Sequence, residues 1–288
     1  MAELTASVLR SPAVAASPVP VRPLGVAELL DTAVRLVRRN ARASFSLSFP
    51  FAVVRAGLVA LLLLQTAHSR NFATVQLLLE LFVSALFGTM LTGLLAPVFI
   101  GEVLGRRLHA TQAMATARTS LFALAAMSLV VAAAQEVGVV VLFVGGAWLW
   151  GIWAVAAPAL VIERLGAGRA LARSFHLVRT DYWRTWGIRA LRWLLTTTLG
   201  LFLTIPFTAI AAAVSGSDLL ATDGPGISNP GVYVAIVAVG NLLATTVLTP
   251  ISAAVDSLLY LDLRMRREGL DLVLGLPPVA AQPAAQAW

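Results

Sequence analysis

The stretch ERLGAGRALARSFHLVRTDYWRTWGIRALRW, residues 163–193, is basic and aromatic and lies between two long apolar runs. At helical spacing, its first half places apolar and basic side chains on opposite faces. The apolar face carries Leu171, Ser174, Phe175, Val178 and Tyr182, and the polar face carries Arg169, Arg173, His176 and Thr180. We therefore expect an amphipathic helix on a membrane surface, with its arginines beside the lipid headgroups.

The composition excludes an ordinary soluble domain. Of the 288 residues, 59% are hydrophobic and only 12% are charged, whereas soluble domains carry about 25% charged residues. The apolar runs are long enough to cross a hydrocarbon core of about 30 Å. The predicted fold class is therefore all-α, a polytopic membrane protein.

Charge and cysteine content narrow the partners and cofactors. All 21 basic residues are arginine, which together with the many alanines indicates a bacterial genome of high GC content. The net charge of +7 would suggest nucleic acid in a soluble protein, but the arginine positions fit membrane topology better. No nucleic-acid partner is expected, and the absence of cysteine excludes disulfides and thiolate metal sites.

Six membrane spans are predicted, with amphipathic surface helices between them. The third and fourth spans share one apolar run, whose turn lies either at Gln135 and Glu136 or at Gly145 and Gly146. We favour the second position because it puts tryptophans at a membrane interface, where such rings are enriched. The predicted interface anchors are Trp148, Trp150, Tyr182, Trp183 and Trp186. The predicted spans are residues 45–67, 75–100, two within 119–162, 188–214 and 231–261.

The distribution of arginine predicts the orientation. Nineteen arginines flank the spans on one side, Arg70 alone lies on the other side, and Arg55 lies within the first span. Because cytoplasmic loops carry the excess of arginine, both termini of this plasma-membrane protein are predicted to be cytoplasmic. Residues 1–23 are predicted to be a disordered tail, 24–264 the integral membrane domain and 265–288 a C-terminal tail.

A second amphipathic helix is predicted at residues 24–42. Its arginines, with those of the opening stretch, predict a cytoplasmic face that binds anionic lipid headgroups or a membrane or cytoplasmic partner protein. The alternative is a solvated helix packed on a soluble partner. The predicted face consists of Arg35, Arg38, Arg39, Arg42, Arg169, Arg173 and Arg179.

An internal repeat is suggested by the pattern A-P-x4-E-x-L-G, which occurs at residues 96–105 and 157–166. Pro250 followed by Asp256 is a weaker third copy. We infer three parallel repeats, residues 24–103, 104–163 and 164–264, each a surface helix followed by a transmembrane hairpin. Chance similarity in a sequence rich in Ala, Leu and Gly is the alternative. Each repeat contains a helix-breaking proline that removes one backbone hydrogen bond, namely Pro97, Pro158 or Pro250.

Arg55 is the most informative single residue, because a charge near the middle of a span must be paired or hydrated. Asp256 in the last span is the predicted partner, with Glu80 and Glu136 nearer the outer surface. A pair of Arg55 with Asp256 is typical of a substrate or proton pathway. The alternatives are a purely structural ion pair, or an arginine that extends to the interface.

The sequence contains no catalytic or cofactor motif. Its three histidines are isolated, without the spacing of a metal site. It also has no G-x-S-x-G elbow and no G-x4-G-K-[ST] loop. No cofactor, metal site or catalytic residue is therefore predicted.

Three motifs nevertheless resemble a known family. They are RPLGVAELLDTAVRLVRRN (residues 22–40), ALARSFHLVRTDYWR (170–184) and LLYLDLRMRREGLDL (258–272). They are similar to bacterial multi-pass proteins that resemble the membrane domain of glycerophosphoryl diester phosphodiesterase. The resemblance implies an integral membrane domain, and no catalytic residue is carried over because the barrel of the true phosphodiesterases has no counterpart here.

The sequence thus predicts a non-enzymatic scaffold or subunit of a membrane complex. The alternative is a small-solute transporter or permease that uses Arg55, Asp256 and the proline-broken helices. A lipid-modifying membrane enzyme is a more distant alternative.

Overall fold

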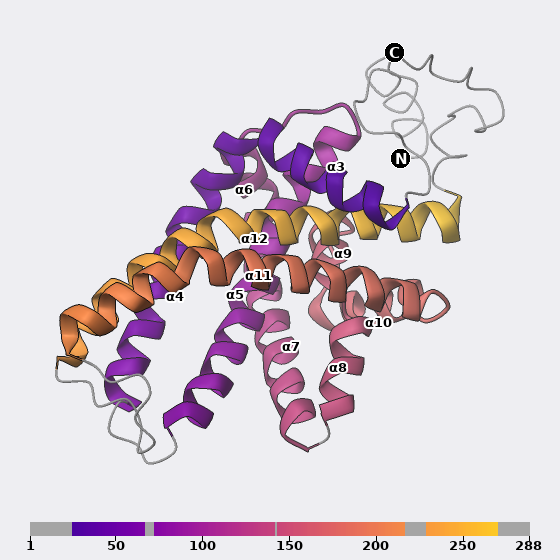
Figure 1. Cartoon of the computed structure of the whole chain (residues 1–288). Helices are drawn as coiled ribbons and strands as arrows, with labels where there is room; N and C mark the ends of the chain where they lie inside the picture. Colours follow the sequence, from indigo (N-terminus) through magenta and orange to yellow (C-terminus); the bar gives the residue numbers. More distant parts are fainter. Residues whose placement is uncertain (1–24, 67–71, 142, 217–228, 270–288) are drawn as a thin grey trace.

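The computed structural model describes residues 25–66, 72–141, 143–216 and 229–269, and within them the chain is all-α (Figure 1). The predicted N-terminal tail and most of the predicted C-terminal tail lie outside the described residues. The helices are α3 (Val26–Arg39), α4 (Ala41–Thr66), α5 (Phe72–Val103), α6 (Ala110–Arg118), α7 (Leu121–Val141), α8 (Phe143–Ile152), α9 (Ala156–Ile162), α10 (Ala167–Val178), α11 (Tyr182–Ser215) and α12 (Pro230–Glu268).

Six helical segments are long and apolar enough to cross a membrane, which confirms the all-α class and the predicted number of long apolar segments. Their outer faces expose large apolar side chains, for example Val54 at 61%, Phe122 at 89% and Phe202 at 74%. Such a surface would cause aggregation in water, whereas it is the normal surface of a helix that faces lipid. The composition and the helix lengths are those of a multi-pass membrane protein.

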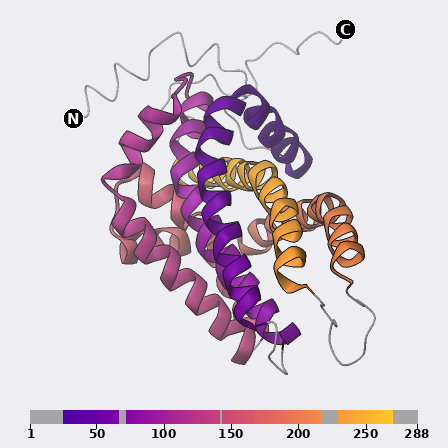
Figure 2. The same ribbon diagram turned by 90° about the vertical axis from the view of Figure 1, so that its left-hand side faces the viewer.

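Helix α12 is central to the packing. Figure 1 shows α4, α5, α7 and α8 side by side, with α11 and α12 lying across them, and α12 contacts α11, α4, α5 and α3. Every residue from Ala253 to Leu263 is buried, so this part of the helix is enclosed on all sides. Figure 2 shows that α12 changes direction along its length, and Pro250 lies inside it.

The turn between the third and fourth spans lies at neither predicted position. Helix α7 ends at Val141 and α8 begins at Phe143, so Gly145 and Gly146 lie inside α8. A Cβ built on Gly146 would lie 2.9 Å from the Val139 backbone nitrogen and 3.1 Å from the Gln135 carbonyl oxygen. These glycines therefore allow α7 and α8 to approach each other closely, and they do not form the turn.

The predicted fourth span is broken in the structure. Helix α8 ends at Ile152 and α9 begins at Ala156, with Pro158 in the first turn of α9. A proline there removes no helical hydrogen bond, because the first N–H groups of a helix have no partner within it. Pro97 and Pro250 by contrast lie inside α5 and α12. Pro50 and Pro206, which the sequence analysis did not single out, lie inside α4 and α11.

The basic stretch at residues 163–193 is divided between two helices. Its first half forms α10, and the segment from Tyr182 onward is the beginning of α11, which is longer than the predicted fifth span. Phe175 of the predicted apolar face is 39% exposed, while Ser174 is fully buried. The Ser174 hydroxyl donates to the Ile152 carbonyl at 2.8 Å and accepts from the Val155 N–H at 3.3 Å. Helix α10 thus supplies the polar partners for the break in the fourth span.

The structure does not show the inferred repeat. Gly25 and Gly166 are both extended N-cap residues, with φ and ψ of −69° and 161° and of −73° and 160°, so α3 and α10 begin alike. Gly105 instead has a φ of 73°, and α6 begins only after His109. The Leu-Gly pair of the second segment therefore closes a helix instead of beginning one.

Replacing Ser174 by alanine should destabilise the protein. Two buried backbone groups would lose their partner, which costs about 1–3 kcal/mol per unsatisfied group. We expect a lower midpoint of thermal unfolding in detergent, followed by the fluorescence of the seven tryptophans. The matched control is Ser46→Ala, since Ser46 is exposed and donates only to the carbonyl of Ala43 on its own helix. Equal midpoints for the two variants would contradict the role assigned to Ser174.

Candidate functional site

The predicted arginine face is divided into inward and outward side chains. Arg38, Arg42, Arg169 and Arg179 are exposed. Arg35 is also exposed and pairs with Asp31 on its own helix. Two other members of the predicted face pair with carboxylates of the helix bundle. Arg39, which is itself exposed, pairs with the buried Glu102 at 3.2 Å, and the partly buried Arg173 pairs with two glutamates.

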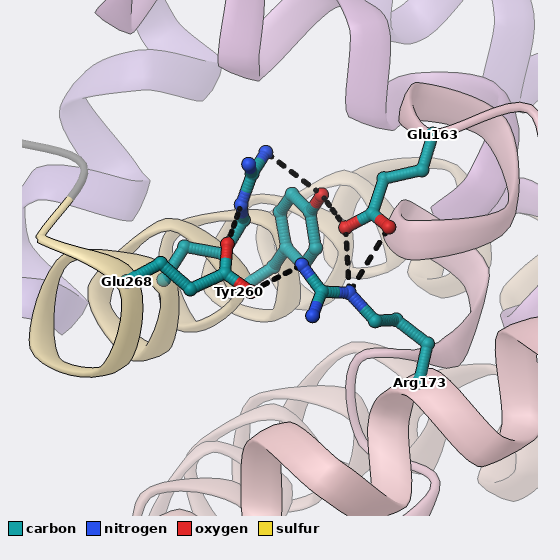
Figure 3. A network of polar contacts seen from close by, with 5 residues as sticks. Glu163, Arg173, Tyr260 and Glu268 are labelled. Carbon is teal, nitrogen blue, oxygen red and sulfur yellow. Dashed lines mark hydrogen bonds and ion pairs between the residues drawn. The ribbon is translucent and has the colours of Figure 1, made fainter. Parts of the chain in front are cut away.

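Arg173 belongs to the polar network shown in Figure 3, which joins α9, α10 and α12. The Arg173 Nε lies 3.0 Å from each Glu163 carboxylate oxygen, and Arg173 also pairs with Glu268. The Tyr260 hydroxyl donates to Glu163 at 2.8 Å. Arg264 donates to Glu268 at 2.9 Å, and its guanidinium lies 5.6 Å from the centre of the Tyr260 ring. Each carboxylate of the network therefore accepts from more than one donor.

Charge balance in this network favours the guanidinium form of Arg173. Burial lowers the pKa of Arg173, but hydrogen bonds and attraction from Glu163 and Glu268 outweigh it, so the pKa is raised overall. The side chain is therefore a fixed cation and not a proton donor. The network is therefore a structural one that holds α10 against α12 by ion pairs, and it is not a set of acid–base groups.

Other carboxylates at this end of the molecule are neutralised in the same way. Asp262 has no exposed surface and pairs with Arg184 at 2.5 Å and with Arg266 at 3.1 Å. Asp181 pairs with Arg267 at 2.9 Å. Inward arginines thus compensate the acidic groups, which leaves the exposed arginines of the same end without compensation.

Arg55 does not pair with Asp256, which corrects the sequence-based expectation. Its guanidinium forms an ion pair with Glu80 of α5 and donates to Ser84 and to Thr245, each at 3.0 Å. Asp256 follows Thr245 by eleven residues on α12, about 16 Å along a helix, so it is out of reach. Arg55 is 8% exposed, and its charge is fully compensated inside the bundle.

A cavity of about 220 Å³ lies next to this ion pair, between α4, α5 and α12. Three of its side chains are polar, and the Glu80 side chain is 41% exposed. A carboxylate and two amides above an apolar floor suit a small polar ligand group. The lining residues are Val59, Leu62, Leu63, Gln76, Leu79, Glu80, Val237 and Asn241.

The predicted aromatic anchors separate into two kinds. Trp150 and Trp186 pack edge to face at 6.2 Å and so join α8 to α11, and Trp186 donates to the Ala147 carbonyl at 3.3 Å. Trp183 is 80% exposed and Trp148 48% exposed, so these two have the exposure that an interface position requires. Tyr182 packs against Trp183 at 5.3 Å.

Sequence reasoning missed the residues that bind the inward arginines. Glu102 and Glu163 occupy the same position in the two A-P-x4-E-x-L-G segments, and each pairs with an arginine of a surface helix, Arg39 of α3 or Arg173 of α10. The repeated glutamate was thus the signal for these two sites. No comparable signal marked Arg189 and Arg192, which were counted only as topology-determining charges.

Comparisons with protein-family models, with curated proteins and with solved structures find no match for this chain. In the part of the chain that the structure describes, no group of three or more His, Asp or Glu side chains is arranged to hold a metal ion.

Replacing Glu163 by glutamine should loosen the contact between α10 and α12. Arg173 would keep only one of its two carboxylates, and losing a charged hydrogen bond costs about 1.5–3 kcal/mol. We expect a lower unfolding midpoint, with partial recovery in the double variant E163Q/R173Q, because the two residues act as one unit. Asp31→Asn is the control, since its partner Arg35 is largely exposed and exposed pairs contribute little. If the unfolding midpoint of E163Q equals that of D31N, the ion pairs of Glu163 do not hold α10 against α12.

Proposed function

We propose that this chain is a non-enzymatic integral protein of a bacterial plasma membrane. In this proposal it is a scaffold or subunit of a membrane complex whose arginine-rich face is cytoplasmic. That face contacts anionic lipid or a partner protein. The observation that carries the proposal is the division of charge at this end: carboxylates are neutralised inside, while arginines remain uncompensated outside.

The uncompensated arginines come from different surface segments. Among the described residues, seven exposed arginines have no carboxylate within ion-pair distance. They are Arg38, Arg42, Arg106, Arg118, Arg164, Arg169 and Arg179. A basic residue at an anionic membrane surface contributes about 1 kcal/mol, and a cluster of this size is sufficient for lipid recognition. The same cluster would bind an acidic protein surface by charge complementarity.

The exposed side of α11 supports the subunit part of the proposal. Only 11% of the most apolar stretch of α11 is buried within this chain. Leu194, Phe202 and Ile205 are among its exposed side chains. A second transmembrane protein could pack on this face without displacing any contact of this chain.

Neutralising the outward arginines should release anionic lipid or a stoichiometric partner. The variant carries Gln at positions 38, 42, 169 and 179 and is purified from native membranes in mild detergent, with mass spectrometry of the bound lipids and proteins. Because each removed charge contributes about 1 kcal/mol, we expect the bound anionic lipid or the partner to fall by at least tenfold.

The matched control for that experiment is R35Q/D31N, which removes an exposed charge pair without changing net charge. It should retain lipid and partner at the wild-type level. If the neutralised variant also retains both, the proposed role of the arginine face is wrong.

A second candidate function is transport of a small solute, and the cavity beside Glu80 favours it. In this reading Arg55 and Glu80 are the functional pair and Asp256 takes no part. The polar lining provided by Gln76 and Asn241 would bind the solute near the ion pair.

Charge-neutralised variants separate transport from a structural ion pair. If the cavity is a transport site, R55Q and E80Q should abolish solute flux in proteoliposomes while their unfolding midpoints stay near wild type. A purely structural pair predicts lower midpoints in both single variants and partial recovery in the double variant. N241A, at the cavity wall, should then change flux only if solute passes there.

We also propose a family for this chain and a repeated origin for parts of it. The three motifs described above support membership of the family that resembles the membrane domain of glycerophosphoryl diester phosphodiesterase. The matching glutamates and the similar starts of α3 and α10 support a repeated origin for parts of the chain.

A further inference from the structure

Four buried polar atoms without a hydrogen-bond partner lie on the facing sides of α11 and α12. They are the Thr185 Oγ1, the Nε atoms of Arg189 and Arg192, and the Asp256 Oδ1, out of seven such atoms in the described part of the chain. Arg189 is 8% exposed and Asp256 5% exposed. Because buried polar groups in native proteins are almost always satisfied, this concentration indicates a missing partner.

The three α11 side chains share one face of their helix. Thr185, Arg189 and Arg192 follow one another at spacings of four and three residues, which places them in a row. Arg189 interacts electrostatically with both Asp256 and Arg192. Two members of the row, Arg189 and Arg192, therefore lie near Asp256 of α12, with which α11 runs side by side (Figure 1).

The single carboxylate does not satisfy the two guanidinium groups. The Arg192 Nε lies 3.8 Å from the Asp256 Oδ1, which is beyond hydrogen-bond range. Arg189 is directed elsewhere: it donates to the Trp150 carbonyl at 2.8 Å and its guanidinium lies 4.6 Å from the centre of the Trp150 ring. The cluster thus carries a net charge of one positive unit in a site almost closed to solvent.

A neighbouring cluster on the same two helices has the same ratio of charges but is more open to solvent. There Asp262 accepts from Arg184 and Arg266, whose side chains are 24% and 33% exposed. At Asp256 one aspartate again faces two arginines, but Arg189 is only 8% and Arg192 only 11% exposed. An uncompensated buried cation is strongly unfavourable, so a second anion would stabilise this cluster.

We propose that Arg189, Arg192 and Thr185 bind an anionic phosphate group beside Asp256. Guanidinium groups match the oxygens of phosphate and can bind two of them at once, and the Thr185 hydroxyl provides a further donor. The group is either the phosphate of a lipid headgroup or a free phosphate ion. The site is distinct from the exposed arginine face and goes beyond the proposed function.

Access from the lipid side is compatible with the surroundings of the cluster. Trp193 and Leu194, which follow Arg192 directly, are 57% and 55% exposed, so the outer face of α11 at this level is apolar. A phospholipid could lie along that face with its phosphate turned toward Arg192, whose side chain is 11% exposed.

The test is a titration of the purified full-length protein in an uncharged maltoside detergent, followed by tryptophan fluorescence during heating. The probes are short-chain phosphatidylglycerol, phosphatidylcholine of the same chain length, inorganic phosphate, and chloride at matched ionic strength. Native mass spectrometry counts the bound lipid. The wild type should show a saturable rise of its unfolding midpoint with phosphatidylglycerol, with inorganic phosphate, or with both.

The variants locate the effect. R192Q should weaken the binding of the active probe by at least tenfold, and the control R35Q/D31N, which removes an exposed ion pair without changing the net charge, should change it by less than twofold. D256N should tighten binding, because it removes the carboxylate that competes with the added anion. If R192Q does not fold, R192K provides the same test, since it keeps the charge but lacks the planar fork and should lose an intermediate part of the affinity.

Each outcome decides the proposal. A response to phosphatidylglycerol alone identifies a lipid headgroup site, and a response to inorganic phosphate as well identifies a site for the free ion. Equal responses of R192Q and R35Q/D31N, or a response to chloride as large as that to phosphate, would overturn the proposal. The variant with the outward arginines neutralised should keep the part of the response that R192Q removes, so failure of the proposed function and failure of this site are distinguishable.

Discussion

The enclosed carboxylates of the arginine-rich end control how this molecule is assembled. Glu102 and Asp262 are buried and Glu163 is partly buried among apolar helices, where an unpaired charge is very unfavourable. The arginines that neutralise them come from segments outside the apolar spans or at their ends, so each ion pair also attaches a peripheral segment to the bundle. The surface helices are therefore held in place by charge neutralisation from inside as much as by their apolar faces.

The same principle explains why α12 is the centre of the fold. Its segment from Ala253 to Leu263 is buried on every side, and it contains both Asp262 and Tyr260, which bind partners on α9 and α11. A helix surrounded by other helices can accept donors from several directions. That geometry lets the side chains of one segment link the end of α9 and the start of α11 through polar contacts.

Sequence patterns were sufficient for the fold class and for the positions of most apolar helices, because hydrophobic length and helical periodicity depend only on local residues. They failed where helix contacts determine the outcome. Gly145 and Gly146 resemble a turn in the sequence, yet in the structure Gly146 lies within a helix pressed against Val139. Arg55 could have paired with any acidic residue of similar depth, and only the packing of α4 against α5 selects Glu80. The A-P-x4-E-x-L-G segments were noticed as a repeat, but that their glutamates are ion-pair sites depends on contacts between helices, which the sequence alone does not specify.

The hydroxyl of Ser174 has a consequence for the order of events during folding. The carbonyl of Ile152 and the N–H of Val155 belong to a segment that is synthesised before α10. Until α10 has formed, these two backbone groups lack the partner that they have in the final structure. The break in the fourth apolar segment therefore reaches its final hydrogen bonding only after a later helix has packed against it.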